Sequence, residues 1–271
     1  AEAAAPSGCR RRAALATLCS GALLPSPQPA LAEEGPAAAV GEFAKSVLGP
    51  DSDVFYPGWF LGDWAASTEL VKVDFPQGEA LAGQAAVQQR DVLGTPRAVE
   101  QYPQRYMSYG NGVIADRAYN MRGYIRGSGG GPRAFESVDW EPSRPDRVVV
   151  VIKRNGTSVR TETRVTRRSV GAPEGAEDLF NASEVYQQIV ESPGKQTKVT
   201  PIRCVNKFKR ISAKEIQVLQ RLEIFPRLDG SSVQIENGDP SMPLVIYKYR
   251  GILDKREDGY SPDQSGVMKS L

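Results

Sequence analysis

The segment Asp116-Arg117-Ala118-Tyr119-Asn120 carries the residue types best suited to a binding site. On a β-strand, side chains alternate between faces, so Asp116, Ala118 and Asn120 would share one face. A carboxylate and an amide that face the interior of a barrel need hydrogen bonds or a ligand, because burying them unsatisfied is costly. We therefore predict four ligand-binding residues: Asp116, Ala118, Tyr119 and Asn120. The competing interpretation is that Asp116 and Arg117 make structural bonds to neighbouring strands or a loop.

The chain contains no histidine, which is the usual general base near neutral pH and the commonest transition-metal ligand. This excludes Ser-His-Asp and Cys-His mechanisms, and zinc would have to rely on Cys204 and carboxylates, unlike ordinary zinc sites. No Walker-type phosphate loop is present either. An enzyme would depend on a carboxylate such as Asp116 or Glu215 with a raised pKa in a cleft. We therefore predict no catalytic residue, no metal site and no cofactor.

Basic residues crowd positions 153–168, where Glu162 is the one acidic residue. Valine and threonine alternate with the arginines over 159–165, so the simplest interpretation is a solvated outer face of a strand. The functional alternative is a contact surface for anionic lipid headgroups or for an acidic patch of a membrane complex. That surface would consist of Arg160, Arg164, Arg167 and Arg168. Nucleic acid is not an expected partner, because no aromatic platform accompanies the basic residues.

Most of the chain between residues 55 and 256 alternates polar and apolar side chains with a period of two, which is typical of β-strands. The predicted strands are residues 64–73, 113–125, 134–140, 147–153, 158–170, 202–209, 215–225 and 244–253. The dipeptide Asn155-Gly156 indicates a tight turn, so 147–170 is the clearest hairpin. Two short helices are predicted at residues 40–48 and, after a capping-box pattern at Asn181 and Glu184, at residues 185–190.

These short antiparallel strands predict an all-β fold, either a barrel or a sandwich. The pairing of Gly62-Asp63-Trp64 in the first strand with Arg250 in the last resembles the lipocalin and calycin barrels. The resemblance implies that Trp64 plugs one end and that Arg250 lies across its ring in a cation–π contact. We therefore predict a lipocalin/calycin-like β-barrel closed by Gly62, Trp64 and Arg250, with a β-sandwich as the alternative. The aromatic residues at 55, 56, 59 and 60 are expected to seal one barrel end.

Residues 10–34 follow the order of an export signal, with three arginines, a short apolar core and an A-x-A cleavage pattern before Glu33. The apolar core is shorter than the roughly 20 residues needed to span a bilayer as a helix. Twin-arginine and ordinary secretory export both stay open, and the alternative to a signal is an Ala/Pro-rich disordered tail. The domain prediction is a cleaved signal at 1–32, a linker with a short helix at 33–54, one β-barrel domain at 55–256 and a flexible tail at 257–271.

The body that remains after cleavage at residue 32 has equal numbers of acidic and basic residues. This balance argues against a polyanionic partner recognised by bulk charge. Cys204 is its one cysteine, so no disulfide can form within the body. Packing must therefore stabilise the fold.

Seven segments in the same order and at similar spacing resemble the domain-of-unknown-function 6816 family of plants, algae and cyanobacteria. They are residues 56–64, 67–71, 74–78, 113–120, 164–169, 197–208 and 247–250. The resemblance implies a chloroplast thylakoid lumen protein, in agreement with the export signal; a bacterial periplasm or cyanobacterial lumen is the alternative. It implies neither a reaction nor a ligand.

Together these features predict a non-enzymatic lumenal β-barrel that binds an apolar small molecule such as a lipid, pigment or quinone-like compound. A carrier of this kind needs an apolar cavity on the order of 300–1,000 Å³. The alternative is an auxiliary or assembly protein that serves a photosynthetic membrane complex through its surface, for which a filled barrel is sufficient. The oligomeric state is left open.

Overall fold

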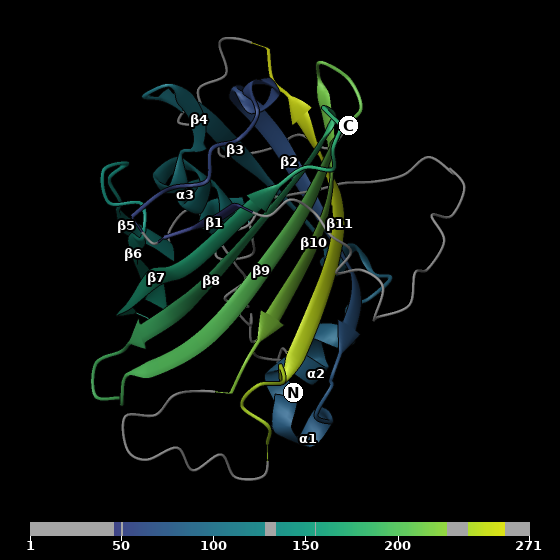
Figure 1. Ribbon diagram of the computed structural model, residues 1–271. Helices are drawn as coiled ribbons and strands as arrows, with labels where there is room; N and C mark the ends of the chain where they lie inside the picture. Colours follow the sequence, from purple (N-terminus) through teal and green to yellow (C-terminus); the bar gives the residue numbers. More distant parts are fainter. Residues whose placement is uncertain (1–45, 50, 128–133, 155, 227–237, 258–271) are drawn as a thin grey trace, which may run out of the picture.

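The computed structural model describes residues 46–49, 51–127, 134–154, 156–226 and 238–257. One antiparallel sheet of 11 strands curls into a half barrel (Figure 1). The strands are β1 (Ser46–Leu48), β2 (Gly62–Asp74), β3 (Val99–Tyr109), β4 (Gly112–Ala115), β5 (Phe135–Asp139), β6 (Arg147–Arg154), β7 (Thr157–Gly171), β8 (Leu179–Glu191), β9 (Lys198–Arg210), β10 (Glu215–Ile224) and β11 (Val245–Lys255). The all-β prediction is confirmed, and one continuous curled sheet fits barrel features better than a sandwich.

The strands follow the spatial order β4-β3-β2-β11-β10-β9-β8-β7-β6-β5. Consecutive strands pair from β5 to β11, as expected when short connections join antiparallel neighbours. The exception is the ladder between β2 and β11, in which Lys255 lies opposite Trp64. This contact brings the start and the end of the described sheet together, so the concave face is lined by residues from both halves of the chain.

Helix α3 (Arg117–Gly127) and the strap, which we define as residues 51–60, lie across the open side of the half barrel. Helix α3 packs against β3 and also contacts β5 and β6, the strands at the other end of the sheet. The strap follows β1, which pairs with β7, and Tyr56 in the strap forms a bridge to Val113 in β4. Both segments therefore connect the two sides of the sheet that strand pairing leaves separate.

Short helices make up the rest of the described structure: α1 (Glu79–Ala82), α2 (Gln84–Arg90), and the 3-10 turns η1 (Gly58–Phe60) and η2 (Pro96–Ala98). Ala82 and Ala86 pack with Leu70, Val73 and Val245 in a small apolar cluster. The α1–α2 pair therefore covers one end of the half barrel, as its position below β2 and β11 in Figure 1 shows.

The predicted strand at 113–125 is wrong beyond residue 115, because the chain turns into α3 there. The Asp116 carboxylate accepts a hydrogen bond of 2.9 Å from the Tyr119 backbone N–H. This is the geometry of a helix N-cap, which satisfies one of the amide groups that a helix start leaves without a partner. The capping role of an aspartate outweighs the local alternation of side chains.

Three other local predictions differ from the structure. Residues 185–190 belong to strand β8, since β7 and β9 pair with it on both sides. Residues 46–48 form β1, while the remainder of the predicted helix at 40–48 lies outside the described residues. Strand β3 was not predicted, and Pro103 lies within it. A proline has no N–H to donate, so it fits a strand only where no neighbouring strand needs that bond. At Pro103 the neighbour on that side is helix α3.

Gly123 sets how closely α3 approaches β3. A Cβ atom on Gly123 would lie 2.7 Å from the Pro103 carbonyl oxygen and 2.8 Å from Pro103 Cγ. We expect Gly123→Ala to lower the free energy of unfolding by about 1–3 kcal/mol, as overpacking does. Gly58→Ala is the control, since nothing lies within 4 Å of its Cβ position. Urea unfolding of both variants checks this, and equal small effects would contradict the close helix–strand contact.

Candidate functional site

Asp116 and Asn120 bind the edge of β3 at the start of α3. The Asn120 side chain accepts a 2.6 Å hydrogen bond from the Arg105 backbone N–H and donates one of 3.1 Å to the Arg105 carbonyl. The amide therefore continues the sheet where strand pairing to β4 has ended. The Tyr119 ring lies 4.1 Å from the Arg105 guanidinium carbon in a cation–π contact. The helix-capping bond of Asp116 agrees with the structural interpretation of that residue, and Asn120 makes structural bonds as well. Ligand binding by Asp116, Ala118, Tyr119 and Asn120 stays a prediction.

Arg117 also makes structural bonds, as the competing interpretation expected, but its partners form a buried ion cluster that was not predicted from the sequence. We define the cluster as Asp53 from the strap, Arg117 from α3, Arg168 from β7 and Glu184 from β8. Arg117 Nη2 lies 2.5 Å from Asp53 Oδ1 and 2.8 Å from Glu184 Oε1. Arg168 Nε donates to Glu184 Oε1 at 2.8 Å. Two cations thus meet two carboxylates.

Arg168 also binds the backbone on both sides of the cluster. Its Nη1 donates to the Ser52 carbonyl at 2.9 Å, and its Nη2 donates to the Pro145 carbonyl at 2.7 Å. The side chain is fully buried. The guanidinium therefore holds the strap and the loop before β6 against the wall of the half barrel.

Burial and pairing oppose each other within the ion cluster. Burial alone would raise the pKa of Glu184, but Arg117 and Arg168 outweigh it and lower that pKa to about 2. The carboxylates in turn hold the pKa of Arg117 well above its usual value despite burial. Asp53 Oδ2 and Arg117 Nε make no hydrogen bond within the described structure. Glu184 therefore stays ionised and Arg117 stays protonated near neutral pH. The cluster joins four segments of the chain through these ion pairs.

The low pKa of Glu184 makes stability depend on acidity in a defined window. A carboxyl whose pKa falls from 4.5 to about 2 on folding contributes stability that is complete above pH 4.5 and is lost as the pH falls toward 2. We expect Glu184→Gln to flatten the pH dependence of the unfolding free energy between about pH 4.5 and 2. Urea unfolding at several pH values tests this. An unchanged slope in the variant would contradict the assigned pairing.

The predicted surface of four arginines is only partly at the surface. Arg168 is buried, because strand β7 has a register shift between Val165 and Arg167. Such a bulge moves the following residues to the opposite face, so Arg167 is exposed and Arg168 points inward. Placing Arg168 on the contact surface was therefore wrong.

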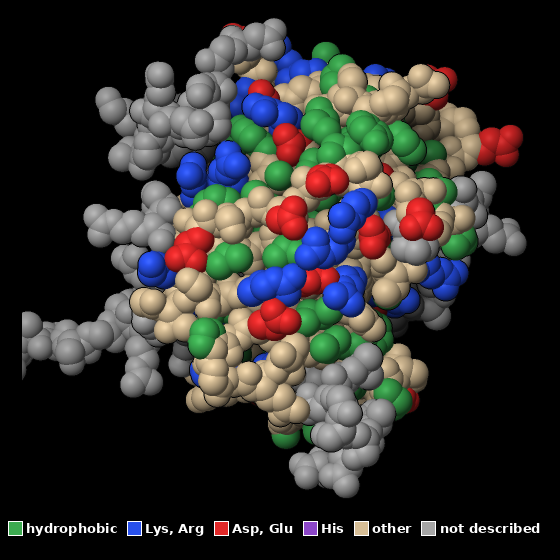
Figure 2. All heavy atoms as spheres, turned by 90° about the vertical axis from the view of Figure 1, so that its left-hand side faces the viewer, with side chains coloured by type: hydrophobic (Ala, Val, Ile, Leu, Met, Phe, Trp, Pro, Cys, Tyr) green, Lys and Arg blue, Asp and Glu red, His purple; other side chains and the backbone are tan. Residues whose placement is uncertain are grey.

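Arg160 and Arg164 lie on the outer face but are paired. Both guanidinium groups bind Glu162, and Arg160 also lies 2.9 Å from Glu191. Arg147 is a third cation near Glu162, at 3.4 Å. Figure 2 shows acidic side chains interleaved with basic ones on this side of the molecule. A uniform basic patch is absent from that face, and whether it contacts a membrane stays a prediction.

Trp64 is buried in the core at one end of the half barrel, and its cationic partner is Lys255. The Trp64 side chain is 1 % exposed, and its Nε1 donates to the Phe60 carbonyl at 2.6 Å. Lys255 Nζ lies 5.3 Å from the ring. Gly62 allows this approach, because it has a φ of 120° and its Cβ position lies 3.2 Å from Lys255 Cε.

The predicted contact between Trp64 and Arg250 is wrong. Arg250 lies on the outer face of β11, where its Nε donates to Glu69 Oε2 at 2.8 Å. Tyr247 and Tyr249 occupy the concave side, so strand alternation sends Arg250 the other way. A sequence signal for Lys255 was available: if the strand continues beyond Leu253, alternation places Lys255 on the same face as Leu253.

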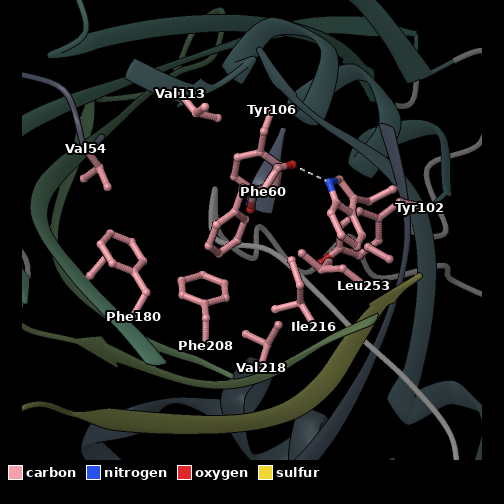
Figure 3. Close-up of a cluster of buried hydrophobic side chains, with 13 residues drawn as sticks. Val54, Phe60, Tyr102, Tyr106, Val113, Phe180, Phe208, Ile216, Val218 and Leu253 are labelled. Carbon is pink, nitrogen blue, oxygen red and sulfur yellow. Dashed lines mark hydrogen bonds between the residues drawn. The ribbon is translucent and has the colours of Figure 1, made fainter. Parts of the chain in front are cut away.

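Aromatic rings fill the half barrel at the Trp64 end (Figure 3). Phe60 is fully buried and contacts the rings of Tyr56, Tyr106 and Phe208 at centroid distances of 4.9, 4.8 and 5.0 Å. The expectation that the strap aromatics form core at this end is confirmed for Phe60, with Tyr56 and Trp59 packed against it. Phe55 differs, since half of it is exposed.

Beyond this aromatic plug the concave face becomes polar and then apolar again. A polar belt crosses the middle of the sheet, where Gln220 Nε2 donates to Asn206 Oδ1 at 3.0 Å and Thr68 Oγ1 donates to the Tyr102 hydroxyl at 3.0 Å. An apolar group follows, made of Val165, Tyr186, Ile202, Cys204 and Leu222, with Ile224, Tyr247 and Tyr249 packed against it. The last three keep part of their surface exposed. The concave face therefore offers a tyrosine-rich surface next to a polar belt.

The part of the chain that the structure describes contains no group of three or more histidine, cysteine, aspartate or glutamate side chains that could hold a metal ion. Within the same residues, no helix is long and apolar enough to cross a membrane. Cys204 is buried, and its Sγ accepts a hydrogen bond of 3.6 Å from Asn206 Nδ2.

Comparison with known proteins gives one match. The model of a family described as a domain of unknown function, DUF6816, matches residues 48–257. No curated protein and no solved structure matches the chain. The matched range starts at the last residue of β1 and ends after β11, so it takes in the strap, α3 and strands β2 to β11. The chain belongs to the DUF6816 family.

Proposed function

We propose that this protein is a non-enzymatic binding protein whose half barrel holds a small molecule with a largely apolar body, such as a lipid, pigment or quinone-like compound. The observation that carries the proposal is that Ile224, Tyr247 and Tyr249 pack on the apolar group of the concave face and keep part of their surface exposed. Apolar and aromatic side chains that line a concave surface, with a few polar groups beside them, are typical of small-molecule sites.

The two ends of the half barrel differ, and the difference indicates how a ligand would lie. The aromatic plug around Phe60 occupies one end, so an apolar body would lie on the other side of the polar belt. Ile202 and Leu222 form the floor there, at 3 % and 1 % exposure. The belt side chains, which are hydrogen-bonded to one another, would face one end of the ligand.

Location is part of the same proposal. The arginine-led apolar segment at 10–34 favours export into the thylakoid lumen of a chloroplast, or into a bacterial periplasm or cyanobacterial lumen. Those residues lie outside the described structure. Immunogold labelling or fractionation of the source cells would test it, and a protein found in the stroma or cytosol would contradict it.

Filling the concave face tests ligand binding. We expect Ile224→Trp to weaken binding of an apolar ligand by roughly ten-fold or more, because the larger ring fills space that the ligand would occupy. Each ligand group that loses its place in an apolar pocket costs about 1–3 kcal/mol of binding free energy. Leu219→Trp is the matched control, since Leu219 lies on the outer face of the same strand and is 53 % exposed. Native mass spectrometry of the full chain with a lipid and pigment extract gives the bound fraction. Equal binding by both variants would contradict a concave-face site.

The second candidate is an auxiliary protein that serves a membrane complex through its surface. Phe55 and Tyr109 favour it, since both are large and are 50 % and 40 % exposed. They lie near each other, because Phe55 packs on Gly112 and Gly112 pairs with Tyr109. A chain that purifies from its source without an apolar adduct and bound to a membrane complex would favour this function over ligand binding.

A further inference from the structure

Glu100 is a carboxyl group on the concave face that has no counterion in the described structure. It lies opposite Thr68 in the ladder between β2 and β3, so both side chains face the interior. Burial raises its pKa, which a hydrogen bond with Tyr124 only partly offsets, and no lysine or arginine acts on it. A partly buried carboxylate without a cation is unfavourable, and Glu100 differs in this from every member of the ion cluster.

The nearest cations on the neighbouring strands are turned away from Glu100. Lys248 and Arg250 lie on the outer face of β11, where Lys248 is 3.2 Å from Asp74 and Arg250 is 2.8 Å from Glu69. The inward positions of β11 are Tyr247 and Tyr249 instead. On β11, the tyrosines therefore face the interior with Glu100, and the two positive charges lie on the outer face.

Tyrosines from three elements lie around Glu100: Tyr124 on α3 hydrogen-bonds to it, Tyr249 on β11 lies near it, and Tyr102 shares its face of β3. Tyr102 on β3 and Tyr124 on α3 meet edge to face, with ring centroids 5.1 Å apart, and Tyr247 and Tyr249 on β11 are 6.4 Å apart. Burial, followed by the proximity of Glu100, Tyr247, Tyr102 and Cys204, raises the pKa of Tyr249 well above its usual value. Burial also raises the pKa of Tyr247 to about 12. Tyr247 and Tyr249 therefore stay neutral near neutral pH, and Glu100 is the carboxyl group beside them.

We infer that this tyrosine-ringed carboxylate binds an ammonium group at the polar end of the ligand. The inference rests on the proposed function, since the apolar body of the ligand would lie along Ile224 and Leu222. Glu100 supplies the counterion, and the faces of the tyrosine rings attract a cation through their quadrupoles. A carboxylate head group would instead meet a like charge with no cation beside it.

Four probes with the same octyl chain and different head groups test the inference: octyltrimethylammonium, octylammonium, octanol and octanoate. Isothermal titration of the full chain at pH 7.5 should give at least roughly ten-fold tighter binding of the two ammonium probes than of octanol, and the weakest binding for octanoate. In Glu100→Gln this preference should disappear while octanol binding is kept. Glu69→Gln is the matched control, because Glu69 lies on the outer face beside Thr68 and faces Arg250.

The pH dependence separates an ammonium site from a site for a neutral head group. Octyltrimethylammonium keeps its charge at every pH, so only the protonation of Glu100 can change its affinity. As the pH is lowered below the pKa of Glu100, the affinity should fall by up to about ten-fold per pH unit. A neutral oxygen-bearing head group would bind better as Glu100 gains a proton to donate. Tyr247→Leu is a second variant in case Glu100→Gln unfolds, and it should reduce the ammonium preference without reducing octanol binding.

The outcomes distinguish the two proposals. Equal affinity of ammonium and octanol probes, or tighter binding of octanoate, would overturn the ammonium site and leave the concave binding site in place. Failure of all four probes to bind would overturn both. Selective ammonium binding that is lost in Glu100→Gln and kept in Glu69→Gln would support both.

Discussion

Glu184→Ala should lower the free energy of unfolding by about 3–5 kcal/mol, because it removes one partner of a buried ion network and leaves Arg117 and Arg168 under-compensated. Glu184 binds both guanidinium groups, with 2.8 Å contacts to Arg117 Nη2 and Arg168 Nε. Arg168 is fully buried and Arg117 is 5 % exposed, so water cannot replace the lost carboxylate. Chemical denaturation monitored by tryptophan fluorescence measures the change.

The control for this experiment is Glu191→Gln on the same strand. Glu191 pairs with Arg160 at 2.9 Å, but 46 % of its side chain is exposed, and exposed pairs contribute about 0–1 kcal/mol. A loss below about 1 kcal/mol in Glu184→Ala would show that Asp53 or water compensates the arginines, and the ion cluster would then not be what fastens the strap.

Trp64→Ala should destabilise the protein by about 3–5 kcal/mol, the range for large aromatic residues removed from a core. Trp64 is 1 % exposed and supports Phe60 through its hydrogen bond to the Phe60 carbonyl. Removing the indole therefore opens a cavity and also weakens the start of the aromatic plug. Thermal or urea unfolding gives the size of the effect.

A double-mutant cycle identifies the cationic partner of Trp64. Lys255→Ala should be non-additive with Trp64→Ala by about 0.5–2 kcal/mol, the range of a cation–π contact. Arg250→Ala should add to Trp64→Ala within about 0.5 kcal/mol, as distant sites do. Coupling to Arg250 in place of Lys255 would contradict the geometry at this end of the half barrel.

Local sequence patterns predicted most strands because a period of two survives wherever one face of the sheet is buried. The hairpin at 147–170 and the strand at 215–225 are the clearest cases, since β6, β7 and β10 cover almost the same residues. The pattern failed where a local signal competed with it. Asp116 ended a strand by capping a helix, and a bulge after Val165 reversed the faces of Arg167 and Arg168.

The ion cluster could not be found from spacing, because its members are far apart in the chain. Arg117 contacts Asp53 across 64 positions and Glu184 across 67. One sequence signal was available: Glu184 shares the inward phase of β8 with the buried Ala182 and Tyr186. A charged residue at an inward position indicates a buried partner, but the partner itself is set by how the strap and α3 cross the sheet.

The sequence by itself determined the all-β class, most strand positions, the aromatic strap and the lack of histidine chemistry, since these depend on residue type and on short-range alternation. Only the tertiary structure decided which cation meets Trp64, that Arg168 is buried, and that Glu100 lies among tyrosines with no counterion in the described part of the chain. These pairings depend on strand register and curl, because a shift of one residue sends every side chain of a strand to the other face. Periodicity specifies the faces of a strand, whereas the fold specifies what each face meets.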